Sequence, residues 1–317
     1  MKANADLLSP ASTLIAVDWG STNFRASLVV DGDVVDHLES PDGIRHRNGR
    51  DYDDLLHALV GHWRAARGEA DVVMSGMVGS REGWVEVPYA AAPAGVADLA
   101  AGIVRVPSRH FGSVAIIPGV RWDDPQNGTT DVMRGEETQV AGLLDGLPEE
   151  EAVTLCLPGT HSKWIVCRHG KIERFRTFLT GEAFERLTRD SLISGDGRAA
   201  IDPNSPAFAR GLTLSADTDG GLLHHLFLGR TEMLTGRVAP DALSSLISGL
   251  LIGHEIREGA SFADGTLYLN GTSPVAQATA TAMRLLGFEL RQDSRNSHLA
   301  GLRAIAEKWN GRVDPDG

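Results

Sequence analysis

The chain has 317 residues, of which 42% are hydrophobic and 23% are charged, and its formal net charge is −12. This length is sufficient for two domains, and the composition is typical of a globular protein with hydrophobic cores. The negative charge argues against a nucleic-acid-binding protein, which normally presents a basic surface. No apolar run reaches the ~18–20 residues that a membrane span requires.

The cysteine content and the N-terminal residues bear on the cellular compartment. Only two cysteines, Cys156 and Cys167, are present, so the sequence predicts no disulfide framework and suits a reducing compartment. Residues 1–13 lack the continuous apolar core of a signal peptide, and we expect them to form a loose leader. We therefore expect a cytoplasmic protein with neither a membrane partner nor a nucleic-acid partner.

The first predicted elements are three strands in a meander. An apolar strand, Leu14–Val17, ends in Asp18, and a turn at Gly20–Asn23 leads into a second strand, Phe24–Val30. The pair Asp31-Gly32 then predicts a hairpin turn into a third strand. Because a strand follows the glycine turn, the pattern disfavours the P-loop and the Rossmann fingerprint, both of which need a helix there.

The turn after Asp18 has the chemistry of a phosphate site. Backbone N–H groups and hydroxyls of Gly20, Ser21 and Thr22 can hold phosphate oxygens, while Asp18 can hold Mg²⁺ directly or through water. The alternative is an ordinary hairpin in which Asp18 is only a turn residue.

The next predicted elements precede the middle of the chain. We expect an amphipathic helix over Asp51–Arg67 and a buried strand over Val72–Met74, followed by the loop SGMVGSREGW. Pro93–Val104 is predicted to be helical and Val114–Ile117 to be a strand. The loop Asp123–Thr130, rich in Asp, Pro, Asn and Gly, is predicted to lead into a second domain.

The second half repeats the first pattern. A helix is predicted over Asp131–Leu144, and Leu155–Glu173 again shows a strand, a Pro-Gly-Thr-His-Ser turn and further strands. Two such units in one chain suggest a duplicated architecture with two phosphate turns. Further on, a helix is expected over Asp241–Gly259, a strand–Gly–helix unit begins at Thr266, and a last helix spans Leu299–Trp309.

These motifs resemble a known superfamily. The turn DWGSTNFR resembles the phosphate-1 motif of the sugar kinase, Hsp70 and actin superfamily, and LPGTHSKW resembles its phosphate-2 motif. Within it the chain resembles the 2-dehydro-3-deoxygalactonokinase family (2-keto-3-deoxygalactonate kinases). The matching stretches are IAVDWGSTNFRA, VVMSGMVGSREGW, IIPGV, DVMRGEETQ, LPGTHSKW, FRTFLTGE and SGLLIGHE.

The resemblance implies an α/β fold made of duplicated actin-like, ribonuclease H-like domains with mixed five-stranded sheets flanked by helices and a cleft between them. Residues 1–130 would form the N-terminal domain, with the phosphate-1 motif and the substrate loops. Residues 131–317 would form the C-terminal domain, with the phosphate-2 and adenosine motifs. The implied activity is ATP-dependent phosphorylation of 2-dehydro-3-deoxy-D-galactonate at its terminal 6-hydroxyl, with Mg²⁺ as cofactor.

The resemblance also implies roles for individual residues. Glu136 would be the catalytic base, with Glu137 as its competitor and a carboxylate pair favoured by the helix dipole as the alternative. Asp18 would hold Mg²⁺, and Arg25 would neutralise phosphate charge. The residues expected to bind ATP are Gly20, Ser21, Thr22, Gly159, Thr160, His161, Lys163, Gly271, Thr272 and Gln277. For Lys163, a lysine pointing to solvent is an equal alternative.

The substrate is expected to contact Ser75, Met77, Arg81 and Trp84. Arg81 offers a bidentate fork for the substrate carboxylate, although a solvated loop arginine is the rival interpretation. The sequence does not separate the galactonate epimer from the gluconate one, and it leaves open whether the protein forms a homo-oligomer. Two other functions stay open, a kinase of another sugar or sugar acid and a non-kinase actin-like ATPase.

Overall fold

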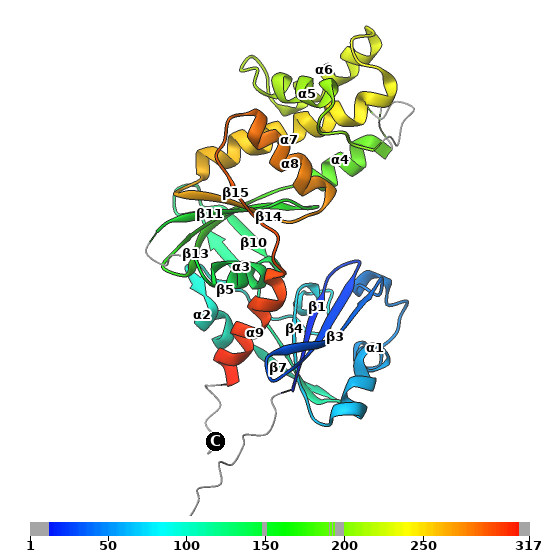
Figure 1. Ribbon diagram of the computed structural model, residues 1–317, viewed down its shortest axis with the longest axis vertical. Helices are drawn as coiled ribbons and strands as arrows, with labels where there is room; N and C mark the ends of the chain where they lie inside the picture. Colours follow the sequence, from blue (N-terminus) through cyan, green and yellow to red (C-terminus); the bar gives the residue numbers. More distant parts are fainter. Residues whose placement is uncertain (1–12, 148–150, 190, 192, 194–199, 311–317) are drawn as a thin grey trace, which may run out of the picture. The chain divides into compact units, whose positions relative to one another are not determined.

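The structure is a computed structural model that describes residues 13–147, 151–189, 191, 193 and 200–310 (Figure 1). Residues 1–12 of the expected leader lie outside this description. The described chain divides into two compact units. Unit 1 contains residues 13–147, 170–172 and 296–310, and unit 2 contains the described residues within 151–169 and 173–295.

A mixed sheet of six strands forms the centre of unit 1, in the order β3-β2-β1-β4-β8-β7. The first three strands form an antiparallel meander, β4 and β8 continue the sheet in parallel, and β7 is antiparallel at its edge. The predicted meander is thus confirmed. The strands are β1 (Thr13–Trp19), β2 (Phe24–Val30), β3 (Asp33–Ser40), β4 (Asp71–Ser75), β7 (Val104–Ser108) and β8 (Gly112–Ile116).

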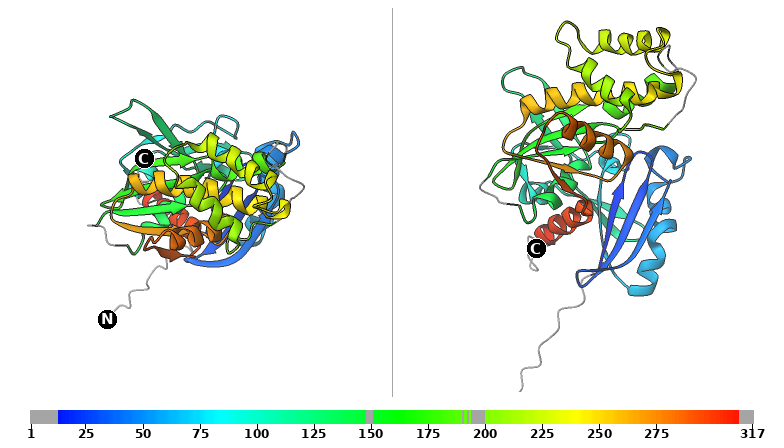
Figure 2. Two further views of the ribbon diagram at one scale, coloured as in Figure 1. Left: turned by 90° about the horizontal axis from the view of Figure 1, so that it is seen from above. Right: turned by 45° about the horizontal axis from the view of Figure 1, so that its top comes forward.

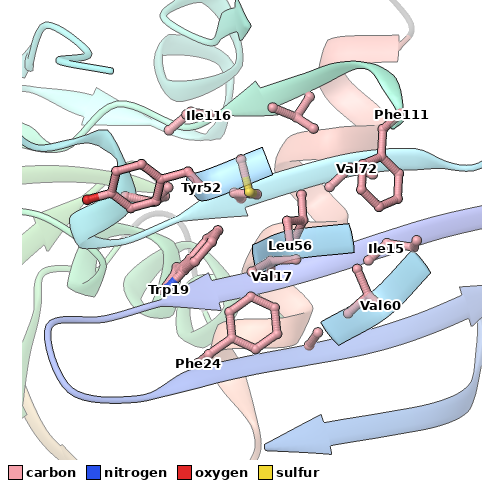
Figure 3. Packing of buried hydrophobic residues seen from close by; sticks show 14 of the residues in the cluster. Ile15, Val17, Trp19, Phe24, Tyr52, Leu56, Val60, Val72, Phe111 and Ile116 are labelled. Atoms are coloured by element: carbon pink, nitrogen blue, oxygen red, sulfur yellow. The ribbon is translucent and has the colours of Figure 1, made fainter. Parts of the chain in front are cut away.

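One helix, α1 (Tyr52–Arg67), supplies much of the core against this sheet. Asp51 begins the helix as its N-cap, because its side chain accepts hydrogen bonds from the backbone N–H groups of Asp53 and Asp54. The ring of Trp19 meets the ring of Tyr52 edge to face, with centroids 5.6 Å apart. Figure 3 shows these rings among the other buried side chains of the cluster, which include Ile15, Val17, Phe24, Leu56, Val60, Val72, Phe111 and Ile116.

A small sheet in unit 1 corrects the predicted helix over 131–144. The sheet has the order β10-β9-β5 and consists of β5 (Ala90–Ala91), β9 (Val120–Asp123) and β10 (Thr130–Met133). Pairing with β9 holds residues 130–133 extended, and Gly135, with φ of 111°, reverses the chain before α3 (Glu136–Leu144) begins. The helix therefore starts five residues later than the sequence pattern predicts.

The stretch 93–104 is also less helical than predicted. It contains the short strand β6 (Ala94–Gly95), the helix α2 (Val96–Ala101) and the first residue of β7. Asp98 accepts a hydrogen bond from the backbone N–H of Gly95, which fixes the start of α2. Only the middle of the predicted helix is confirmed.

The C-terminal helix α9 (Ser297–Asn310) belongs to unit 1 and packs against α3 and α2. Two glycines permit this contact. A Cβ atom on Gly142 would lie 1.8 Å from the carbonyl oxygen of Ser297, and one on Gly301 would lie 1.8 Å from that of Thr138. Each helix therefore presents bare backbone to the other at this crossing.

Unit 2 is built on a sheet with the order β15-β14-β11-β12-β13. Its strands are β11 (Val153–Leu157), β12 (Ser162–Arg168), β13 (Lys171–Phe178), β14 (Thr266–Asn270) and β15 (Arg291–Asp293). The first two residues of β13 are grouped with unit 1, where they pair with β6. The second predicted meander is confirmed, and β14 and β15 run parallel to β11 as its continuation.

The helices of unit 2 pack around one long buried helix. This is α7 (Leu243–Phe262), and α5 and α6 lie against it in every view (Figures 1 and 2). The others are α4 (Thr180–Arg189), α5 (Pro206–Ser215), α6 (Leu222–Leu234) and α8 (Pro274–Leu285). Short 3-10 turns lie at Ile44–His46, Met77–Gly79 and Pro240–Ala242. The predicted helices near the C-terminus are confirmed within a few residues.

The two units share one strand order. In each, an antiparallel meander supplies three strands and two later strands extend its first strand in parallel, as β3-β2-β1-β4-β8 and β13-β12-β11-β14-β15. This is the duplicated, actin-like and ribonuclease H-like α/β architecture that the sequence predicts. Each of these two sheets has six strands rather than the predicted five, because β7 pairs with β8 and β6 pairs with β13. No helix in the described part of the chain is both long enough and apolar enough to cross a membrane.

The unit division and the domain prediction follow different criteria. The loop at 123–130 joins β9 to β10 inside unit 1, and residues 131–147 pack with the residues before them. The sequence pattern instead predicts a domain boundary after residue 130, at the end of the first repeat. By their contacts, α3 and α9 belong to unit 1, the unit that contains the first phosphate turn.

We expect Gly301→Ala to destabilise the fold. Alanine normally stabilises a helix interior relative to glycine by about 1 kcal/mol, but here the new methyl would overlap the Thr138 carbonyl. Overpacking of this kind costs about 1–3 kcal/mol, so the urea midpoint of the variant should fall. The matched control is Glu307→Ala on the exposed face of α9. An unchanged or raised midpoint for Gly301→Ala would contradict the close approach of α3 and α9.

Candidate functional site

The first phosphate turn follows β1 directly and is held by a neighbouring segment. The Gly20 N–H donates to the Asn23 carbonyl at 2.9 Å. The carbonyls of Gly20 and Ser21 accept from the N–H groups of Ile44 and Arg45 at 3.0 and 3.1 Å. These bonds fix the shape of the turn and leave Ser21 half-buried and Thr22 exposed. The side-chain hydroxyls expected to face a phosphate thus lie at or near the surface.

Asp18 and Arg25 lie opposite each other on β1 and β2. Arg25 Nη1 is 3.3 Å from Asp18 Oδ2, and Arg25 Nε is 3.5 Å from a carboxylate oxygen of Glu39. The Asp18 side chain is 24% exposed, so its carboxylate is accessible while one of its oxygens already faces a cation. The structure therefore brings the two predicted residues together.

The strand β4 ends beside Asp18. It runs parallel to β1 with Ser75 opposite Asp18, so both side chains emerge at the carboxyl edge of the sheet. A Cβ atom on Gly76 would lie 2.9 Å from the Trp19 carbonyl oxygen and 3.4 Å from Asp18 Oδ1. With φ of 92°, Gly76 turns the chain tightly against the aspartate.

The start of α3 adjoins the same edge. A Cβ atom on Gly135 would lie 3.4 Å from the Cα atom of Gly76, so Glu136 begins its helix next to the turn that contacts Asp18. Glu136 is half-buried, and its Oε2 accepts from the Arg134 N–H at 3.1 Å. Gly76 thus lies between Asp18 and Gly135, the residue that precedes Glu136, within unit 1.

Glu137 has a different environment from Glu136. It is fully buried, and it accepts from the Gly135 N–H at 2.7 Å and from the Thr138 hydroxyl at 3.0 Å. Burial, and secondly the charge of Glu136, raise the pKa of Glu137 to about 8. A buried carboxyl that is largely protonated at neutral pH is poorly suited to accept a proton from a substrate.

The expected substrate residues lie at the end of β4, which Ser75 closes, and in and after the Met77–Gly79 turn. Met77 is half-buried and Arg81 is exposed. The Trp84 ring stacks on Tyr52, with centroids 6.2 Å apart and an interplanar angle of 11°. Ser75 is fully buried, and its hydroxyl shares a hydrogen bond of 2.7 Å with His298.

Two residues near this edge were missed from the sequence. Arg134 lies two residues before Glu136; its Nη2 donates to the Val87 carbonyl at 2.8 Å, and its guanidinium stacks on Tyr89. His298, at the start of α9, reaches Ser75 and Asp18. Arg134 stands inside the DVMRGEETQ motif, which is a signal, whereas no local pattern marks His298.

The second phosphate turn lies in unit 2 against the start of α4. The Glu182 N–H donates to the Thr160 carbonyl at 3.0 Å, and His161 Nε2 is 2.7 Å from a carboxylate oxygen of Glu182. The Ser162 hydroxyl accepts from the Gly159 N–H at 3.3 Å. Lys163 is only 3% exposed, so the alternative of a solvent-pointing lysine is wrong.

A pocket of about 240 Å³ opens next to this turn, entirely within unit 2. The turn supplies its polar end, and the start of α8 supplies one wall. Its lining residues are Gly159, Thr160, Thr180, Gly181, Phe184, Ile201, Ser248, Leu251, Ile252, Pro274 and Val275. The apolar walls suit a flat aromatic group, and the glycine turn suits phosphate oxygens.

The adenosine motif contributes only in part to this pocket. Pro274 and Val275 line it, whereas the predicted Gly271, Thr272 and Gln277 do not. Gln277 Nε2 donates to the Thr272 carbonyl at 2.9 Å and braces the turn. A larger groove of about 820 Å³ lies at the opposite ends of β11 and β14 and contains none of the residues expected to bind ATP.

The donor set fits a magnesium ion of the kinase type. Among the described residues, no group of three or more His, Cys, Asp or Glu side chains is arranged to hold a metal. Mg²⁺ in phosphate-transfer sites keeps several waters and uses one or two carboxylates plus the substrate phosphates. Asp18, an accessible carboxylate beside a phosphate turn, meets that requirement.

Comparison with known proteins identifies the family of the chain. The profile of the family described as 2-keto-3-deoxy-galactonokinase matches residues 18–305. The chain is 35% identical to the 2-dehydro-3-deoxygalactonokinase of Escherichia coli (strain K12) over 300 residues, which cover 92% of this chain and 97% of that protein. It is 32% identical to a Rhizobium meliloti (strain 1021) protein named "Probable 2-dehydro-3-deoxygalactonokinase", covering 94% and 98% of the two chains.

A solved structure is also similar. The crystal structure of a Sinorhizobium meliloti protein described as a "putative 2-dehydro-3-deoxygalactonokinase" superposes with a TM-score of 0.83 at 29% identity, and covers 93% of this chain and 98% of that one. The match extends over both units. The chain therefore belongs to the 2-keto-3-deoxy-galactonokinase family.

Proposed function

We propose that this protein transfers the terminal phosphate of ATP to the 6-hydroxyl of 2-dehydro-3-deoxy-D-galactonate. Family membership over nearly the whole chain supports this activity. The observation that supports it in the structure is that Gly76 lies against Asp18 on one side and against Gly135, the residue before Glu136, on the other, at one edge of the unit 1 sheet. Phosphoryl transfer needs mainly positioning and charge neutralisation, and this edge offers a carboxylate, a cation and a base.

The general base in this proposal is Glu136. It is half-buried, whereas Glu137 is fully buried with a raised pKa. Glu136 accepts the proton of the substrate hydroxyl as that oxygen attacks the terminal phosphorus of ATP. The bond between that phosphorus and the bridging oxygen then breaks, and ADP leaves.

Asp18 and the two glycine turns hold the nucleotide. When bound, Mg²⁺ neutralises charge on the phosphates, and Asp18 is the residue proposed to hold it. Gly20, Ser21 and Thr22 bind phosphate oxygens from one turn, and Gly159, Thr160 and His161 bind them from the other. The adenine base occupies the 240 Å³ pocket between α4, α7 and α8. Lys163, Gly271, Thr272 and Gln277 support the second turn and the pocket.

The substrate carboxylate requires a cation. Arg81 is exposed at the loop after β4 and is the proposed ligand, with Ser75, Met77 and Trp84 nearby in sequence. The guanidinium of Arg134, whose Nε and Nη1 are buried, borders the same loop, because its Nη1 lies 3.0 Å from the position that a Cβ on Gly79 would occupy. Two arginines at this loop favour an anionic sugar acid over a neutral sugar. We also propose that the protein acts in the cytoplasm.

The activity is tested by ADP release from Mg-ATP with 2-keto-3-deoxygalactonate, 2-keto-3-deoxygluconate and a neutral hexose. We expect turnover on the galactonate acid. Turnover only on a neutral sugar would support kinase activity but would reject the proposed recognition of a substrate carboxylate. ATP hydrolysis that is indifferent to all three would favour the non-kinase ATPase.

Glu136→Gln should lower kcat by about 10²–10⁴ with little change in the KM for either substrate, because general-base catalysis is lost while binding is kept. The control is Glu69→Gln, whose side chain is 96% exposed on the same unit. Steady-state kinetics of ADP release make the comparison. Near-wild-type turnover of Glu136→Gln would reject Glu136 as the base.

Asp18→Asn should raise the Mg²⁺ concentration needed for half-maximal rate by about tenfold or more, because the amide keeps the shape but loses the charge that a hard cation needs. A Mg²⁺ titration at fixed ATP measures this. Asp33→Asn, at an exposed position on β3, is the control. Equal half-saturating concentrations in Asp18→Asn and wild type would refute the metal role.

Glu137→Gln should change how stability depends on pH. Since the pKa of Glu137 is about 4.5 in the unfolded chain and about 8 in the folded one, the folded state holds the extra proton between these values. The contribution of Glu137 to the free energy of unfolding is therefore fully present below pH 4.5. It is lost as the pH rises toward 8, at up to about 1.4 kcal/mol per pH unit. Urea unfolding at pH 5.5, 6.5 and 7.5 should therefore show a flatter profile for the Gln variant. Parallel profiles would contradict the raised pKa.

A further inference from the structure

We propose that His298 is a positioning residue for phosphoryl transfer, which holds the Asp18 carboxylate and the Ser75 hydroxyl in the geometry that the reaction needs. The inference rests on the proposed function, because it assigns a role within the same site. It concerns a residue about 280 positions from Asp18 in the sequence that no motif singles out.

The fold places His298 at the site through helix packing. α9 contacts α3, β1 and β4, and its second residue is His298. The close approach at Gly142 and Gly301 sets the depth of α9, with the Ser297 carbonyl against Gly142. Because Ser297 is itself buried, the first turn of α9 is fixed next to the edge where β1 and β4 end.

The contacts of His298 converge on that edge. Its Nε2 shares a hydrogen bond of 2.7 Å with Ser75 Oγ and lies 3.8 Å from Asp18 Oδ1. The other carboxylate oxygen of Asp18, Oδ2, faces Arg25 at 3.3 Å. The carboxylate is therefore flanked on both oxygens, by an imidazole on one side and a guanidinium on the other. Since the carboxylate torsion of aspartate is otherwise broad, these flanks define its orientation.

The contacts of His298 lie in a largely buried environment, which strengthens them. The side chain of His298 is 19% exposed and that of Asp18 is 24% exposed, while Ser75 is fully buried. Hydrogen bonds in a partly water-excluded environment orient groups more strongly than they do in water. Residues that orient a metal-binding carboxylate typically affect metal affinity or activity by 10–100-fold when removed.

A simpler role for His298 is to satisfy the buried Ser75 hydroxyl, which would otherwise lack a partner. That role explains one contact but not the approach to Asp18. The two roles differ in a Ser75→Ala background, where the hydroxyl is gone. If the only role of His298 is to form a hydrogen bond with Ser75, it becomes dispensable in that background. If His298 orients Asp18, it stays necessary there.

The experiment compares His298→Leu, His298→Gln and the double variant Ser75→Ala/His298→Leu with wild type and Ser75→Ala. Glu307→Gln on the exposed face of α9 is the control. Kinetics of ADP release give kcat and the KM for the sugar acid. Calorimetry of Mg-ATP binding without the sugar acid and urea midpoints complete the set.

We expect His298→Leu to lower kcat by about 10–100-fold and to weaken Mg-ATP binding, with the KM for the sugar acid within about twofold of wild type. Gln, whose amide can still donate to Ser75 Oγ, should recover part of kcat. His298→Leu should remain damaging in the Ser75→Ala background.

Three results would overturn the inference. The first is a kcat of His298→Leu within about twofold of wild type. The second is a decrease in kcat that parallels the decrease in urea midpoint to the same extent in the Leu and Gln variants. The third is an unchanged kcat when His298→Leu is added to Ser75→Ala. Wild type without turnover on any sugar acid would instead reject the proposed function. In that case Mg-ATP calorimetry still decides the role of His298, because unchanged affinity in His298→Leu would overturn it.

Discussion

The contact between α3 and α9 through Gly142 and Gly301 is the constraint on which the candidate site depends. The helices meet so closely that a methyl group on either glycine would overlap a carbonyl of the other helix. Because Glu136 is the first residue of α3 and His298 is the second residue of α9, this one crossing sets the position of both residues relative to the sheet. Side chains of ordinary size at the crossing would hold the helices farther apart and move both groups.

The electrostatics of the site follow from burial. Asp18, Glu136 and Glu137 bring three carboxyl groups to one region, and three full negative charges would repel the phosphates of a nucleotide. Burial of Glu137 keeps that group largely protonated at neutral pH, and Arg25 offsets the charge of Asp18. The site therefore carries less negative charge than its composition suggests, which supports the proposal that Glu136, rather than Glu137, is the base.

The sequence predicts those parts of the fold that depend on local signals. Asp31-Gly32 marks the first meander because that pair readily adopts the left-handed backbone the turn needs. The amphipathic pattern of 51–67 marks α1 because residues three or four apart share one face of a helix. The helix over 131–144 is wrong at its start, since pairing with β9, a long-range interaction, holds residues 130–133 extended. His298 was missed for the same reason, because its neighbours Asp18 and Ser75 lie more than 200 residues earlier.

The path of the chain explains why the last helix matters to the first turn. Unit 1 takes its residues from both sides of unit 2: apart from the short stretch 170–172, the chain returns to it at residue 296. The β-meander and the Asp18 turn can form from the first residues, but the helix that flanks Asp18 with His298 comes from the last part of the described chain. Glu136 lies in α3, which packs on that helix. The edge that contains Asp18 is therefore complete only when the first and last described parts of unit 1 have packed together, which ties the first phosphate turn to the folding of all of unit 1.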